Sequence, residues 1–559
     1  MSGGIGLLTA VVLLGAAAPP QPVCEPVLGP GLKAGAWGVL RVELINTWRS
    51  PGRATVMQRG GANARAVLTA SELKPGQHGE FFIPFRALDP RAPLYAGIES
   101  EALKPGSDWG APRFDDAVLA AGEPLVVEVR ASAGPQLLLP VRMQHGRVHP
   151  DRLPDWSAAY EGVDILVFSE VPSGGLAPSK LRALRAWYRS GGTVVVRSTG
   201  ALLDLSSALL GQPTADPKSR AEWAGLLGGE SRVARWRDGR PQLASFGAGF
   251  GRGVLALPGA KGGSPRWVGL AQEAYGRRPA AIAPAVRRDL YHRRESFPRL
   301  SGSLVGAGRA LRRSLIALLL LAALGGLLWR RRRPAIFAAA VALSALAAIL
   351  VVLWALPQPR VRAMSLRVDE FSPDGMGVRA REYLYLEKAE GNPDVDVLAG
   401  PGVLPSPILY AEGEAAALSF RMEPRRTGGG SGFLLADLAF REESLFLGAG
   451  PLPDARVLKP GELPQGSRLV RVDHLSKDRA ISAMADCMAS PGGRLRPQAE
   501  FLAEALWSER QFQRALEPGA PQRIAVCRLP AVAPQLEPDG SEVVVTSLKR
   551  VGIFYGVRK

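Results

Sequence analysis

The stretch Asp164–Gly200, DILVFSEVPSGGLAPSKLRALRAWYRSGGTVVVRSTG, has the residue pattern of a strand, a helix and a second strand. Ile165–Phe168 is an apolar run too short for a helix and is bounded by turn residues, which is typical of a buried strand. Pro178 suits a first helical turn, Gly191 suits a C-terminal cap, and the apolar face between them contains Leu181, Leu184, Trp187 and Tyr188. Thr193–Val196 then forms the second strand. Such a unit is typical of a parallel sheet.

Parallel sheets bind ligands at the carboxyl ends of their strands. The residues just past the two predicted strands are Ser169 and Glu170 after the first, and Arg197 and Ser198 after the second. We therefore expect these side chains to converge on one crevice, which is the candidate binding site. Glu170 and Arg197 at its rim are expected to form an ion pair.

The remaining soluble sequence reads as β-structure. Residues 23–130 contain alternating or continuous apolar runs such as VLRVELIN, GEFFIPF and EPLVVEV, which predict a β-sandwich. Residues 131–278 contain the opening stretch and form the predicted parallel α/β domain. Residues 279–313 form a basic connector, and residues 357–559 read as a β-rich domain with strands such as SLRVDEF and VGIFYGV. The predicted fold class is therefore multidomain, α/β plus β.

Length and charge limit the classes of protein to consider. A chain of 559 residues predicts about three or four domains. The formal net charge of +18 raises the question of nucleic-acid binding, but the arginines are scattered through every segment rather than gathered on one face. We therefore expect no nucleic-acid partner.

Three segments suggest export and membrane attachment. The N-terminal residues 1–18 resemble a signal peptide, although they lack Lys and Arg, so a retained anchor is the alternative. The uncharged runs Ser314–Trp329 and Ala335–Leu356 predict a transmembrane hairpin over 314–356, with membrane lipid as a partner. The connection RRRRP is expected in the cytoplasm by the positive-inside rule. This topology predicts an inner-membrane protein of the cell envelope with both soluble regions on the periplasmic side.

The residues that usually carry catalysis or metal binding are sparse. The chain has five histidines, and none has a Cys or carboxylate at ligand spacing. The glycine-rich segment FGAGFGRGVLALPG lacks the Lys and Ser or Thr of a phosphate-binding loop and leads into a strand. The sequence therefore predicts neither a metal nor a cofactor.

The order of GVDILVF, LAPSKLRALRAWYRSGG, TVVV and GFGRGVLAL resembles the class I glutamine amidotransferase-like domain of uncharacterised bacterial membrane proteins. The resemblance covers about residues 138–257 and implies a nucleophile at a sharp turn, in a pattern like Gly-x-Cys-x-Gly, with a later His and Glu. Here Ser198 stands at the Cys position, Gly200 matches the second Gly, and Val196 replaces the first. No His lies between His149 and His292, so the implied triad is incomplete.

These observations predict a non-catalytic scaffold or binding subunit with protein partners in the envelope. The alternatives are an accessory subunit of a transporter or motility complex, and an exported hydrolase that uses Ser198 as nucleophile. An oxidising compartment would also allow a disulfide between Cys487 and Cys527, with two buried thiols as the alternative.

Overall fold

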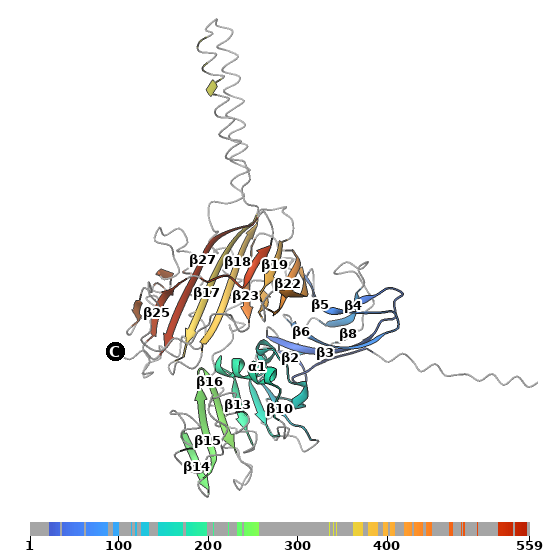
Figure 1. The fold of residues 1–559 in the computed structure, drawn as a ribbon, viewed down its shortest axis with the longest axis vertical. Coiled ribbons are helices and arrows are strands. Elements are labelled where there is room, and N and C mark those ends of the chain that lie inside the picture. Colours follow the sequence, from blue (N-terminus) through green and yellow to red (C-terminus); the bar gives the residue numbers. More distant parts are fainter. Residues whose placement is uncertain are drawn as a thin grey trace, which may run out of the picture.

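The computed structural model of the chain is shown in Figure 1. Apart from a few isolated positions, it describes residues 22–33, 36–60, 63–87, 93–99, 113–114, 118–119, 124–132, 143–170, 175–197, 232–237, 240–256, 361–372, 378–388, 395–400, 403–407, 419–427, 430–439, 443–449, 469–472, 524–530, 532–539 and 543–555. These residues are mostly strand and include one α-helix.

The N-terminal region begins with a three-stranded antiparallel sheet in the order β1 (Val23–Pro26), β3 (Trp37–Ile45) and β6 (His78–Arg86). Side chains alternate along β3, because Leu40, Val42 and Leu44 are buried while Arg41 and Glu43 face outward. The inward side chains of this sheet pack against a second, larger sheet.

The second sheet is built from both ends of the chain. Its eight strands lie in the order β26 (Leu536–Asp539), β19 (Val395–Ala399), β22 (Gly430–Ala439), β21 (Ser419–Thr427), β5 (Asn63–Leu73), β4 (Gly52–Gly60), β7 (Leu94–Glu99) and β8 (Arg113–Phe114). The two halves meet where β5 pairs in parallel with β21, with Val67 opposite Met422. Figure 1 shows the blue N-terminal strands next to the orange C-terminal ones.

A third sheet belongs to the C-terminal region. Its seven strands lie in the order β20 (Leu404–Pro407), β23 (Glu443–Ala449), β18 (Val378–Lys388), β17 (Val361–Phe371), β27 (Val543–Tyr555), β25 (Ile524–Leu529) and β24 (Leu469–Val472). One apolar cluster connects it with the other two sheets and includes Leu40 of β3, Val67 of β5, Ala363 of β17 and Leu435 of β22. Strands from the N-terminal region, such as β3 and β5, therefore share a core with C-terminal strands such as β17 and β22.

Charged side chains also lie inside the C-terminal region. Asp369 on β17 is fully buried and accepts hydrogen bonds from Arg367 Nε at 2.9 Å and Arg550 Nε at 2.6 Å. Glu382 on β18 accepts from the backbone N–H groups of Gln535 and Leu536 at 2.8 and 2.9 Å. Burial raises the pKa of Glu382 above its usual range, although both backbone donors act in the opposite direction. These bonds attach the start of β26 to β18.

The middle sheet contains the stretch that opened the sequence analysis. Its order is β11 (Gln144–Val148), β10 (Leu125–Val129), β12 (Ile165–Phe168), β13 (Thr193–Val196), β16 (Gly251–Ala256), β15 (Arg240–Ala248) and β14 (Arg232–Arg237). The first five strands are parallel to one another. Strand β15 then pairs antiparallel with β16, and β14 pairs antiparallel with β15. The strand β10, which the sequence placed in the N-terminal sandwich, lies between β11 and β12.

Helix α1 (Pro178–Arg189) covers one face of the middle sheet. Its Leu184, Trp187 and Tyr188 are buried in a cluster with Leu166 of β12 and Val194 of β13. The smaller elements are the pair β2 (Leu32–Lys33) and β9 (Val118–Leu119), and the short 3-10 helices η1 (Pro150–Arg152) and η2 (Ser157–Tyr160). Lys33 Nζ lies 2.6 Å from the carboxylate of Asp164, which links β2 to the start of β12.

The predicted fold class is wrong. The described part of the chain is mostly β, with one α-helix, so the five parallel strands of the middle sheet and their single helix do not amount to the predicted parallel α/β domain, and the C-terminal strands share a core with N-terminal ones instead of forming a separate β-rich domain. One local strand–helix–strand unit was taken as evidence for a whole α/β domain. Most other described elements are strands, and the sequence periodicity of a strand does not indicate which strand it pairs with.

The prediction of a transmembrane hairpin, and with it an inner-membrane location, is also not supported. Within the described ranges, no helix combines the length and the apolar character needed to cross a bilayer. Of the predicted hairpin, Ala335, Ala339, Ala342 and Leu343 are described and the rest lies outside the described residues, as do residues 1–18. The prediction of the membrane and periplasmic location rested on two uncharged runs of sequence alone.

The β5–β21 pairing predicts a specific crosslink. Neighbouring strands lie about 4.8 Å apart, which is within the Cα separation of a disulfide, so Val67→Cys combined with Met422→Cys should oxidise to a bond. The measurement is non-reducing mass mapping in a chain whose three native cysteines are replaced by Ala.

The matched control joins Val67→Cys to Val397→Cys. Val397 is also buried, but β19 lies three strands from β5, at about 14 Å, and should give no bond. Equal crosslinking of both pairs, or none in the first pair, would show that β5 and β21 are not neighbours.

Candidate functional site

The connections of the middle sheet diverge between β10 and β12. From β10 the chain goes to β11 on one side, and from β12 it goes to β13 on the other. In open parallel sheets ligands bind in the crevice at such a switch point, at the carboxyl ends of the strands. The residues at this place are Arg130 and Ser132 after β10, and Ser169 and Glu170 after β12. The backbone N–H groups of Ser169 and Glu170 both donate to Val129 O, at 3.1 and 3.4 Å, so the two strand ends are adjacent.

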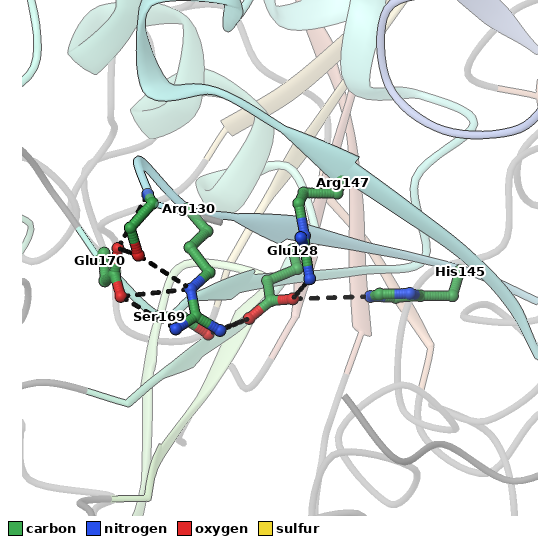
Figure 2. A network of polar contacts seen from close by, with 7 residues as sticks. Glu128, Arg130, His145, Arg147, Ser169 and Glu170 are labelled. Atoms are coloured by element: carbon green, nitrogen blue, oxygen red, sulfur yellow. Dashed lines mark hydrogen bonds and ion pairs between the residues drawn. The ribbon is translucent and has the colours of Figure 1, made fainter. Parts of the chain in front are cut away.

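Glu128 on β10 is the centre of a polar cluster at this switch point. Its carboxylate is fully buried, and Ser169 Oγ donates a hydrogen bond to Oε1 at 2.7 Å. Arg130 Nη1 lies 3.9 Å from Oε1, while Arg147 Nη2 and His145 Nε2 lie 3.7 and 3.8 Å from Oε2. Figure 2 shows Glu128 between Arg130 on one side and the pair Arg147 and His145 on the other.

The pleat of the sheet brings these side chains to one face. In the parallel register Glu128 is opposite Arg147 of β11 and Val167 of β12, so their side chains point to the same side. That side is opposite helix α1, because α1 packs with Val127 and Val129. Gly146 of β11 points the other way, where an added Cβ would meet Gly29 Cα at 2.3 Å. Only a glycine there allows β11 to lie against the N-terminal segment.

Glu170 lies on the exposed side of the cluster and contacts Ser132 and Arg130. Its Oε2 accepts from the N–H of Ser132 at 3.0 Å and from Ser132 Oγ at 2.6 Å, and its Oε1 accepts from Arg130 Nε at 3.2 Å. The hydroxyl of Ser132 is the largest of the causes that lower the pKa of Glu170, and Arg130 acts in the same direction. The carboxylate is therefore ionised at neutral pH.

The structure brings together two of the four predicted site residues. Ser169 and Glu170 lie at the switch point, but Glu170 pairs with Arg130 and not with Arg197 as expected. Arg197 lies one strand further along, where its N–H donates to Phe168 O at 2.9 Å. Ser198 lies outside the described residues.

The predicted disulfide stays a prediction. Cys527 is buried in β25, and Cys487 lies outside the described residues. Cys24 is a separate case in β1, where burial, and secondarily Glu25, raises the pKa of its thiol to about 12. At neutral pH that thiol is protonated and a poor nucleophile.

Sequence reasoning missed Glu128, Arg130, His145 and Arg147. One signal was present, because the run LVVEV has a charged residue inside an otherwise apolar strand. A carboxylate at such a position is buried only with partners, so it marks a polar cluster. His145 and Arg147 flank a glycine in a segment that read as a loop, and their approach to Glu128 depends on the pairing of β10 with β11.

The cluster contains the residue types of a serine-hydrolase triad in the wrong order. In a triad the imidazole lies between the hydroxyl and the carboxylate and takes the proton of the hydroxyl. Here the carboxylate of Glu128 lies between Ser169 and His145. Burial lowers the pKa of His145, against the opposing effect of Glu128, so its imidazole is neutral at pH 7. The described residues also contain no group of three or more His, Cys, Asp or Glu that could bind a metal ion.

Comparisons with known proteins add no family to this picture. No family model matches the chain, and no curated protein matches it significantly. The resemblance to an amidotransferase-like domain therefore rests on short motifs alone.

Glu128→Gln should destabilise the fold. The amide can still accept a hydrogen bond from Ser169, but it has no negative charge to balance the positive charges of Arg130 and Arg147. Because both guanidiniums are partly exposed, we expect a loss of about 1–3 kcal/mol in the free energy of unfolding. Equilibrium urea unfolding measures it.

The control is Glu25→Gln, which removes a carboxylate that pairs with Arg41 at 2.7 Å but is half exposed. Its expected loss is below about 1 kcal/mol. If the two variants lose the same stability, the charge of Glu128 is not what holds the cluster together.

Proposed function

We propose that this protein is a non-catalytic binding or scaffold protein that presents the polar cluster at the carboxyl ends of β10 and β12 for binding. The observation that supports this is the hydrogen bond from Ser169 Oγ to Glu128. A serine hydroxyl becomes a nucleophile only when a neighbouring base takes its proton. Ser169 instead donates to the carboxylate of Glu128, and the imidazole of His145 lies on the other oxygen of that carboxylate, so no imidazole is placed to take the proton of Ser169.

The rest of the architecture is consistent with a scaffold role. Strands from both ends of the chain complete one sheet, and the three outer sheets share one core. The middle sheet contacts this body through the Lys33–Asp164 ion pair and through Val39 of β3, which packs in one cluster with Leu166 of β12. Glu128, His145 and Arg147 lie on strands of this sheet, and side chains on strands are held more accurately than those on loops.

Labelling with a fluorophosphonate probe tests the absence of catalysis. We expect no labelling above that of the Ser169→Ala and Ser198→Ala variants, because Ser169 is not activated and no His lies between His149 and His292 in the sequence. A known serine hydrolase in the same reaction serves as the positive control. Labelling that disappears in either variant would overturn the proposal, and loss in Ser198→Ala would restore the hydrolase alternative.

A further inference from the structure

We propose that the donors after β10, Arg130 and Ser132, form a carboxylate-binding site whose intrinsic occupant is the side chain of Glu170, which an acidic ligand displaces. This rests on the proposed function, since it names the class of ligand that the cluster binds.

The contacts of Glu170 are those of a bound anion. A backbone N–H and a hydroxyl of Ser132 both donate to one oxygen, and the guanidinium of Arg130 donates to the other. Backbone N–H groups, hydroxyls and arginine are the donors that proteins use for carboxylate ligands. All of them belong to the segment after β10, whereas Glu170 comes from the segment after β12. The donor set and its occupant are therefore separate parts of the chain.

The net charge of the cluster favours a ligand with one negative charge. Arg130 and Arg147 balance Glu128 and Glu170, so the cluster is neutral as it stands. Without Glu170 it has an excess of one positive charge next to buried apolar strands. A monovalent carboxylate restores neutrality, while a phosphate dianion would leave an excess negative charge. The depressed pKa of Glu170 agrees with a site that stabilises an anion.

Displacement is feasible because the occupant is exposed and the donors are held. The side chain of Glu170 is 36% exposed, and an ion pair of that exposure contributes little stability. Arg130 is less exposed, at 19%, and lies beside the fully buried Glu128. When Glu170 leaves, Arg130 keeps a neighbouring carboxylate that orients it toward the site. The site is thus retained while its internal occupant exchanges.

Titration of acetate into Glu170→Ala tests the proposal. We expect saturable binding by calorimetry, and a rise in thermal midpoint that sodium chloride at equal ionic strength does not reproduce. The wild-type chain should bind acetate about two- to fivefold more weakly, because the partly exposed Glu170 competes for the same donors. Adding Arg130→Met to Glu170→Ala should abolish binding.

Three results would overturn the proposal: a folded Glu170→Ala chain that binds no acetate, binding that survives Arg130→Met, and tighter binding of inorganic phosphate than of acetate.

If Glu170→Ala does not fold, Glu170→Gln replaces it, because the amide still accepts from Ser132. The affinity of Glu170→Gln for acetate should exceed that of the wild type. Equal affinity would contradict displacement. These failures leave the fluorophosphonate result untouched, so they are distinguishable from failure of the proposed function.

Discussion

The pairing of β5 with β21 is the contact on which the rest of the described structure depends. Without it, β5 and β21 would each leave a row of backbone N–H and C=O groups at the edge of a half-sheet. Paired, they make one sheet that both the N-terminal three-stranded sheet and the C-terminal seven-stranded sheet can cover. Burial of Val67 and Met422 at the junction then adds apolar contact to the backbone hydrogen bonds. A pairing between such distant segments is costly in chain entropy, so it requires this large common core.

Buried charges lie where strands from different parts of the chain meet. Asp369 joins Arg367 on its own strand to Arg550 on β27, and Glu128 joins the carboxyl ends of β10 and β12 to β11. Burial of such groups costs free energy that partners offset only in the correct register. A shift of one residue would turn Glu128 to the α1 side of the sheet, away from Arg147 and Ser169. The charges therefore favour one register over its neighbours.

Local elements were predictable from the sequence, and their partners were not. The strands Ile165–Phe168 and Thr193–Val196 lie where the apolar runs predicted them, and the helix between them is buried through three of the four apolar residues named from the pattern. The alternation of Leu40, Val42 and Leu44 likewise indicated the buried face of β3. The periodicity of a strand indicates which of its faces is buried but does not indicate which strand it pairs with. The assignment of β10 to the N-terminal sandwich, and of the C-terminal strands to a separate domain, failed for that reason.

The same limit explains why most of the candidate site was missed, since only Ser169 and Glu170 of it were selected from the sequence. Sequence reasoning placed the crevice between β12 and β13, which are consecutive along the opening stretch, and so it selected Arg197 and Ser198. A switch point, however, depends on strand order in space, and it lies where two connections leave in opposite directions. Because β11 is added on the far side of β10, that place is between β10 and β12. Ser169 and Glu170 end β12 and border both gaps, so they belong to the site under either placement. Their partners come from β10 and β11 only because β10 lies inside the sheet.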